Sequence, residues 1–149
     1  MSAKPLMFLR YMSTVFDNIK DAVMLMNVEK NGEHFRLLLA NKAFHDMSGF
    51  RPDCVGKELG EFVHPDHLEA MRQNYKRVTR LKKAHNYSTW ADAPVGRRAY
   101  EIEIIPVLST VDEVVQLIVL ARDITKVAML EEKVRALQAA VAPKHQPAA

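Results

Sequence analysis

The stretch VVQLIVLARDITKVAML, residues 114–130, changes its pattern halfway, and this change decides how the chain is built. Residues 114–121 are almost wholly apolar, which is typical of a strand buried on both faces. From Val127 onward, the apolar residues instead follow the seven-residue repeat of a left-handed coiled coil. A buried strand therefore runs through the short polar segment Asp123-Ile124-Thr125 into a dimerising helix, predicted over 126–141. This arrangement is typical of a signal output, not of an active site.

The composition favours one globular domain with flanking helices. The 149 residues are 48% hydrophobic and 26% charged, with a formal net charge of +3, which are ordinary values for a globular protein. No apolar run is long enough to cross a bilayer, and the N-terminus lacks the apolar core of a signal peptide. We therefore expect a cytoplasmic protein with no membrane partner. The single cysteine, Cys54, excludes an internal disulfide and a multi-cysteine metal site.

Together with residues 114–130, alternating and helical patterns in the rest of the chain predict an α+β domain. Five segments have strand patterns: 22–29, 35–40, 85–92, 98–106 and 113–122. Asn31-Gly32 has the residues of a type I′ hairpin turn between the first two. Helical patterns begin after Asn41, a good N-cap, and again at Pro65. The sequence therefore predicts a five-stranded antiparallel sheet with helices on one face and a further helix at each end.

The predicted domain boundaries follow from the same patterns. Residues 1–19 form an amphipathic N-terminal cap helix, 20–125 the α+β domain, and 126–141 the coiled-coil helix, followed by a disordered tail over 142–149. The first two strands carry apolar residues at odd and even positions. We therefore expect the second sheet face to be covered by the N-terminal helix or by a partner.

Five short motifs occur in order on the predicted elements. They are Asn41-Lys42-Ala43-Phe44, Ser48-Gly49-Phe50, Val55-Gly56-Lys57, His64-Pro65-Asp66-His67 and Arg122-Asp123-Ile124-Thr125. Together they resemble the PAS family of sensory domains over roughly Phe16 to Thr125. The resemblance implies a sensor or interaction module that holds a ligand between sheet and helices, forms dimers, and passes a change through its last strand into a C-terminal helix.

In that family, an Asp-x-Thr segment pins the end of the last strand to the start of the helix. The resemblance gives this hinge role to Asp123 and Thr125. Independently, a short polar side chain at a strand–helix boundary can accept hydrogen bonds from the free N–H groups of the first helical turn. The simpler interpretation is that the two residues only cap the helix, which would still fix its exit angle.

The flavin-binding photosensor branch of the family requires residues that this chain does not have. Gly60 stands where the reactive cysteine belongs, and Cys54 lies six residues earlier. Tyr100 and Ala121 stand where amide side chains should bind the polar edge of the ring. An unpaired polar edge would be costly to bury, so we do not expect flavin.

Haem would need a proximal histidine on the long helix that begins at Pro65. The family's ligand position falls nearest to Leu68, whereas His64 and His67 lie at the start of that helix. Helix-start histidines usually face solvent or cap the helix, so we do not expect haem. As a metal site the pair lacks third and fourth ligands, with only Asp66 nearby.

The remaining alternatives are an apolar pocket or a filled core. On strand 98–106, Tyr100, Ile102 and Ile104 share one face, and by the same register Val115 and the residues that alternate with it line that face on the last strand. The predicted pocket residues are Met24, Met26, Phe44, Met47, Met71, Tyr75, Tyr100, Ile102, Ile104, Leu117, Val119 and Ala121. Such a pocket would hold a small apolar or aromatic molecule.

Apolar residues outside the predicted core indicate a homodimer. Valine at the first and leucine at the fourth heptad position favour a coiled coil of two helices. A coiled coil of only two heptads is marginally stable by itself. We therefore expect the N-terminal helix and the outer sheet face to take part. The predicted dimer residues are Phe8, Met12, Ile118, Leu120, Val127, Leu130, Val134 and Leu137. The alternative is a helix that folds back on its own domain.

Basic residues gather on the long helix, with Arg72, Lys76, Arg80 and Lys83 opposite its apolar stripe. This is typical of a solvated face, with an acidic partner as the alternative, and no recognition helix supports nucleic-acid binding. No phosphate loop, nucleophile motif or paired metal motif predicts an enzyme. The sequence thus leaves two hypotheses, a ligand sensor that acts on a downstream effector and a ligand-free interaction module.

Overall fold

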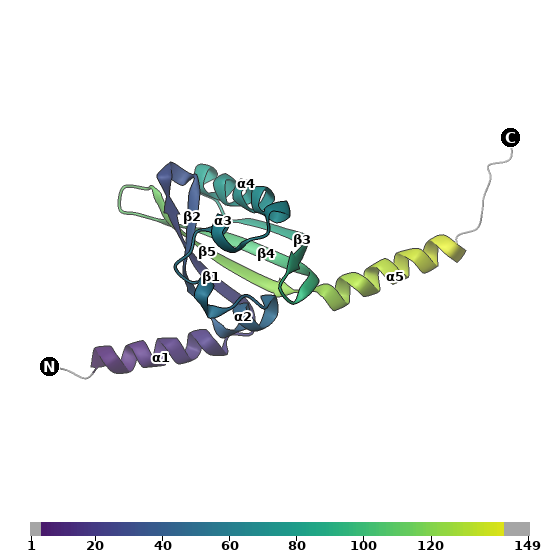
Figure 1. Ribbon diagram of the computed structural model, residues 1–149, viewed down its shortest axis with the longest axis horizontal. Coiled ribbons are helices and arrows are strands. Elements are labelled where there is room, and N and C mark those ends of the chain that lie inside the picture. The colour runs from purple at the N-terminus through teal and green to yellow at the C-terminus, as the bar shows by residue number, and fades with distance from the viewer. Residues whose placement is uncertain (1–3, 142–149) are drawn as a thin grey trace.

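The computed structural model describes residues 4–141 and has the predicted α+β architecture (Figure 1). All five predicted strands are present, and their ends lie within two residues of the predicted ends. The elements are α1 (Lys4–Asn18), β1 (Ala22–Glu29), η1 (Lys30–Gly32), β2 (His34–Ala40), α2 (Lys42–Ser48), η2 (Pro52–Cys54), α3 (Leu59–Phe62), α4 (Pro65–Leu81), β3 (His85–Ala93), β4 (Gly96–Leu108), β5 (Val114–Asp123) and α5 (Thr125–Val141). The predicted disordered tail, residues 142–149, lies outside the described residues.

The five strands form one antiparallel sheet in the order β2-β1-β5-β4-β3. Helices α2, α3 and α4 cover one face of this sheet (Figure 1). Between them lies the core, which contains Met26, Phe35, Leu37 and Tyr75, all at most 1% exposed. The apolar segment predicted to be buried on both faces is β5, which pairs with β1 and β4 on its two sides. Within the described chain only its inner face is buried: Leu117, Val119 and Ala121 are at most 9% exposed, whereas Ile118 and Leu120 on the outer face are partly exposed.

The β1–β2 hairpin is present, but its turn is wider than predicted. The last residue pair is Glu29 with His34, so four residues form the loop instead of Asn31-Gly32 alone. Lys30 has φ 52°, Asn31 φ 56° and Gly32 φ 86°. Three successive residues in the left-handed region give a short 3₁₀-like turn, so the predicted type I′ turn is wrong.

The last strand contains one irregularity that changes a predicted side-chain direction. The β4–β5 register shifts between Val107 and Leu108, so that Val107 faces Gln116 and Leu108 faces Val114. Val115 lies opposite this shift and is 39% exposed, while Val114 packs against the core. The prediction that Val115 lines the inner face is therefore wrong, because a bulge reverses the alternation of a strand.

The two terminal helices extend away from the core in opposite directions in Figure 1. Helix α1 does not cover the second sheet face, so the first of the two predicted covers, the N-terminal helix, is wrong, and the second, a partner, stays a prediction. Phe8 and Met12 on α1 are 62% and 44% exposed, and Leu130 and Leu137 on α5 are 53% and 65% exposed. Within residues 4–141, no helix combines the length and apolarity needed to cross a membrane.

Candidate ligand-binding site

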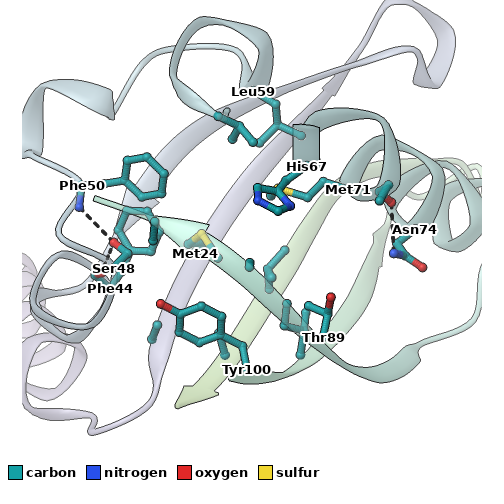
Figure 2. Close-up of a pocket in the computed structure, with 18 of the residues that line it drawn as sticks. Met24, Phe44, Ser48, Phe50, Leu59, His67, Met71, Asn74, Thr89 and Tyr100 are labelled. Atoms are coloured by element: carbon teal, nitrogen blue, oxygen red, sulfur yellow. Dashed lines mark hydrogen bonds between the residues drawn. The ribbon is translucent and has the colours of Figure 1, made fainter. Parts of the chain in front are cut away.

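A cavity of about 150 Å³ lies between the sheet and the helices α2, α3 and α4. In Figure 2, Met24, Thr89 and Tyr100 approach it from the sheet, while Phe44 and Met71 approach it from the helices. Most of its lining is apolar. An apolar cavity of about 150 Å³ is large enough to bind benzene, so the space suits a molecule with one ring.

Nine of the twelve predicted pocket residues line this cavity. They are Met24, Phe44, Met47, Met71, Tyr75, Tyr100, Ile102, Val119 and Ala121. Met26, Ile104 and Leu117 do not line it; all three are 0% exposed and belong to the packed core. They lie on the correct face of the sheet but farther along it, where large side chains including Phe35 fill the space between the layers.

The cavity also has a lining that the sequence patterns did not identify. Further residues come from α2 to α4 and from β3, among them Ser48, Phe50, Leu59, Phe62, His67, Asn74, Tyr87 and Thr89. Tyr87 and Thr89 alternate along β3, and His67, Met71 and Asn74 follow helical spacing on α4. The strand and helix spacings of these residues are present in the sequence. The polar residues among them on α4 were not assigned to the cavity, because polar residues on a helix usually face solvent.

His67 and Asp92 form a polar pair in the wall of the cavity. The backbone N–H of Asp92 donates to His67 Nε2 at 3.1 Å, and one Asp92 carboxylate oxygen lies 3.2 Å from the same nitrogen. These contacts tie the start of α4 to the end of β3. The predicted helix-start role thus describes His64, which caps α4 by accepting from the Asp66 N–H, but not His67.

The residues present do not fit the two cofactors considered for the family. Neither Cys54 nor Gly60 lines the cavity, and the Tyr100 hydroxyl lies 3.5 Å from the Met47 carbonyl oxygen instead of offering an amide. Pockets for drug-sized ligands usually measure about 300–1,000 Å³, well above this volume. In the part of the chain that the structure describes, no group of three metal-ligating side chains occurs.

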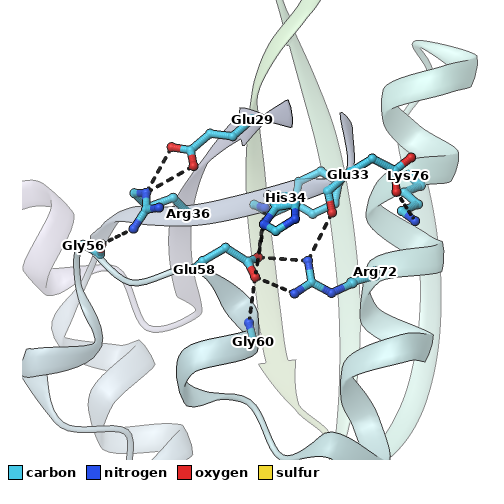
Figure 3. A network of polar contacts seen from close by, with 10 residues as sticks. Glu29, Glu33, His34, Arg36, Gly56, Glu58, Gly60, Arg72 and Lys76 are labelled. Carbon is cyan, nitrogen blue, oxygen red and sulfur yellow. Dashed lines mark hydrogen bonds and ion pairs between the residues drawn. The ribbon is translucent and has the colours of Figure 1, made fainter. Parts of the chain in front are cut away.

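The wall formed by α3 is anchored by the buried carboxylate of Glu58 (Figure 3). It accepts the backbone N–H groups of Phe35 and Gly60 at 3.1 and 3.0 Å and binds the Arg72 guanidinium. Burial alone would raise the pKa of Glu58, but Arg72 and the two backbone donors lower it to about 2. Glu58 therefore stays ionised and holds β2, α3 and α4 together. Arg72, predicted on a solvated basic face, is instead partly buried.

The strand–helix junction is fixed by hydrogen bonds to β4. Asp123 Oδ1 accepts the backbone N–H of Thr125 at 2.9 Å and its hydroxyl at 2.5 Å, which caps the first turn of α5. Thr125 Oγ1 in turn accepts the backbone N–H of Ala99 at 2.9 Å. The Ala99 carbonyl accepts the N–H of Ile124 at 2.9 Å. Because Tyr100 lines the cavity, the residue that holds the junction is the direct neighbour of a cavity residue.

The chain is an α+β domain in which helices cover one face of an antiparallel sheet and a cavity lies between the two layers. Comparison with known protein families shows to which family this domain belongs. The sequence matches the PAS fold over residues 16–128. The chain therefore belongs to the PAS family. No curated protein matches the chain significantly.

Solved structures agree with this fold. A PAS domain from Colwellia psychrerythraea is 17% identical, with a TM-score of 0.64 over 80% of this chain and 98% of that one. The PAS domain of the fruit-fly ELK potassium channel is 22% identical, with a TM-score of 0.58 over 79% and 98%. A sensory box sensor histidine kinase structure from Vibrio cholerae is 15% identical, with a TM-score of 0.57 over 84% and 98%.

Proposed function

We propose that this chain is a cytoplasmic sensory domain that binds a small apolar or aromatic molecule in its cavity. Binding is transmitted through Asp123 and Thr125 to α5. The observation that supports this most directly is the hydrogen bond from the Ala99 N–H to Thr125 Oγ1, next to the cavity residue Tyr100. A similar fold occurs in a sensor histidine kinase. In this role the domain is regulatory and not itself an enzyme.

The mechanism requires two arrangements of β4, β5 and α5 that differ in their affinity for the ligand. A ligand that binds both arrangements equally would change nothing, however tightly it binds. A molecule pressing on Tyr100 or Ala121 favours one position of these strands. Because Thr125 is bonded to Ala99, that shift changes the angle at which α5 leaves the sheet, and a downstream effector responds to the helix.

The working form in this proposal is a homodimer. Exposed apolar side chains on both terminal helices support it, since single folded chains rarely leave such rows in water. On α5 they are Val127, Leu130, Val134 and Leu137, all more than half exposed. Ile118 and Leu120 add partly exposed apolar side chains on the outer sheet face. A second copy of the chain would cover these side chains, as the heptad pattern predicts.

A native mass spectrum of freshly purified protein is the first test. A dimer with a discrete excess mass that disappears on denaturation supports the sensor and begins to identify its ligand. A dimer at bare mass that also fails to bind one-ring aromatic compounds supports the ligand-free interaction module instead. A bare monomer contradicts the dimer.

The junction is tested by replacing Asp123 with Ala. A spin label at position 138 of α5 reports the distance between the two helices of a dimer. We expect toluene to change this distance in the wild type and in the control Asp53→Ala, whose side chain is exposed. In Asp123→Ala, toluene should still bind but leave the distance unchanged, because the helix cap is lost. An undiminished response in that variant would remove the junction from the mechanism.

A further inference from the structure

The hydroxyl group of Tyr75 has no hydrogen-bond partner among residues 4–141, although the residue is only 1% exposed. Its ring packs edge-to-face against Phe35, with the two centroids 5.3 Å apart. No fully enclosed side-chain nitrogen or oxygen atom of the described residues lacks a partner. The unpaired Tyr75 hydroxyl therefore faces open space, and the cavity is the space that this residue lines.

A second phenol lies close to the first. Burial raises the pKa of Tyr75 far above its ordinary value, with the neighbouring Tyr87 adding to the effect. Burial also raises the pKa of Tyr87 to about 12, although the nearby Asn74 side chain partly opposes this rise. Both hydroxyls are therefore protonated at neutral pH and can donate. The cavity has an apolar body and a polar cluster at Tyr75, Tyr87 and Asn74.

The ionisable side chains that line the cavity disfavour the binding of an anionic ligand. Asp92 is the only acidic or basic side chain apart from His67 that lines the cavity within the described residues. His67 is already engaged by Asp92. A carboxylate inside this space would meet no Lys or Arg side chain and would lie near the carboxylate of Asp92, which costs far more than burying a neutral hydroxyl. A neutral polar group that meets Tyr75 avoids that cost.

We infer that the cavity selects a neutral, one-ring aromatic molecule that carries a single hydroxyl group, and that Tyr75 is the residue that recognises this group. The inference rests on the proposed ligand-binding function and adds the chemical class of the ligand. Volume sets the one-ring limit, since about 150 Å³ holds a benzene-sized body. The unpaired Tyr75 hydroxyl favours a ligand with a hydroxyl group, because a buried donor without a partner is stabilised when a ligand supplies an acceptor.

Titration calorimetry with phenol, toluene and benzoate tests this selection in the wild type, in Tyr75→Phe and in the matched control Tyr11→Phe. Tyr11 lies on α1, where it is 67% exposed. In Tyr75→Phe, phenol binding should weaken about 3- to 10-fold, as expected for one lost hydrogen bond, while toluene binding stays equal or tightens. Tyr11→Phe should behave as the wild type, and benzoate should not bind any of the three.

Two outcomes separate failure of the inference from failure of the proposed function. If phenol and toluene both bind and Tyr75→Phe changes them equally, or if benzoate binds, the selection is overturned while the ligand-binding function stands. If none of the three compounds binds the wild type, the proposed function fails and the inference fails with it. Wild-type NMR needs no variant: nuclear Overhauser contacts between phenol and the Tyr75 ring are expected, and their absence from phenol-saturated protein overturns the assignment.

Discussion

At the scale of single residues, Asn41 shows how one side chain holds together three parts of the domain. Its oxygen accepts the N–H groups of Val23 and Phe44 at 2.9 and 3.1 Å. Its nitrogen donates to the carbonyl groups of Phe16 and Asp21 at 3.2 and 3.0 Å. Asn41 is 0% exposed, and all four hydrogen-bonding positions of its amide are used. The end of α1, the start of β1 and the start of α2 are thereby joined.

Replacing Asn41 with Ala should lower the free energy of unfolding by about 2–4 kcal/mol, because four backbone groups lose their partner at a buried position. Chemical denaturation followed by circular dichroism measures the loss. Asn86→Ala, at an exposed position on β3, is the control and should change stability little. Equal stability of both variants would show that water replaces the Asn41 amide without cost.

At the residue level, alternation along the strands indicated the inner face of β4, but it indicated neither the bulge at Val115 nor the depth of the cavity. Tyr100 and Ile102 were assigned to the inner face because a strand has a period of two. The same rule placed Ile104 beside them, yet Ile104 lies in the packed core. Periodicity defines a face but not how far a cavity extends along it. The role of Tyr75 as an unpaired donor depends on distant neighbours, which no local pattern contains.

At the scale of elements, the one-turn helix α3 forms part of the cavity wall although four residues are too few to be stable alone. Glu58 caps it by accepting the Gly60 N–H and ties it to α4 through Arg72. The sequence patterns predicted helices only after Asn41 and from Pro65 and so missed α3, since the pairing of Glu58 with Arg72 joins positions fourteen residues apart. Long-range ion pairs of this kind leave no periodic signal.

The stability of the domain should depend on pH through Glu58. Its folded pKa, about 2, lies below the ordinary value of 4.5, so its contribution is complete above about pH 4.5 and is lost as the pH falls towards 2. The lowered pKa corresponds to about 3 kcal/mol. Urea unfolding across this range should therefore show a loss in the wild type about 3 kcal/mol larger than in Glu58→Gln. Glu101→Gln, at an exposed position, should follow the wild type; a Glu58→Gln profile parallel to the wild type would contradict the assignment.

The exposed seam of α5 gives a second prediction at this scale. Leu130→Glu should convert the dimer into a monomer at micromolar concentration, because a carboxylate at the fourth heptad position would be buried against its symmetry mate. Light scattering coupled to size-exclusion chromatography measures the mass. Ala139→Glu, on the opposite side of the helix, should remain dimeric. A dimeric Leu130→Glu protein would show that another surface holds the two copies together.

At the scale of the whole molecule, folding and association should be linked. The core of the sheet and its helices is well packed, whereas α1 and α5 leave apolar residues uncovered. In a homodimer those residues would be covered by the second copy. Association would then add to the stability of each chain by mass action.

The thermal midpoint should therefore rise with protein concentration, by about 1.5–3 °C for each tenfold increase, because such an increase stabilises each chain of a dimer by about 0.7 kcal/mol. Calorimetry over a tenfold concentration range measures the shift. In Leu130→Glu the midpoint should be lower and independent of concentration. A wild-type midpoint that does not change with concentration would contradict linkage between folding and association.

The pairing of Ala22 with Ala121 places the entry and exit of the sheet domain on neighbouring strands at the same end of the sheet, where Asp21 and Arg122 also form an ion pair at 3.3 Å. This geometry makes the domain a cassette for protein engineering, since the helices at the two junctions can be fused to other modules without cutting the core. The orientation of a module fused to α5 depends on the length of the helix. Each residue added to α5 turns the attached module by about 100° and moves it about 1.5 Å, whereas seven added residues nearly restore its original facing. A series of such insertions would show whether the domain controls its output by the direction in which α5 points.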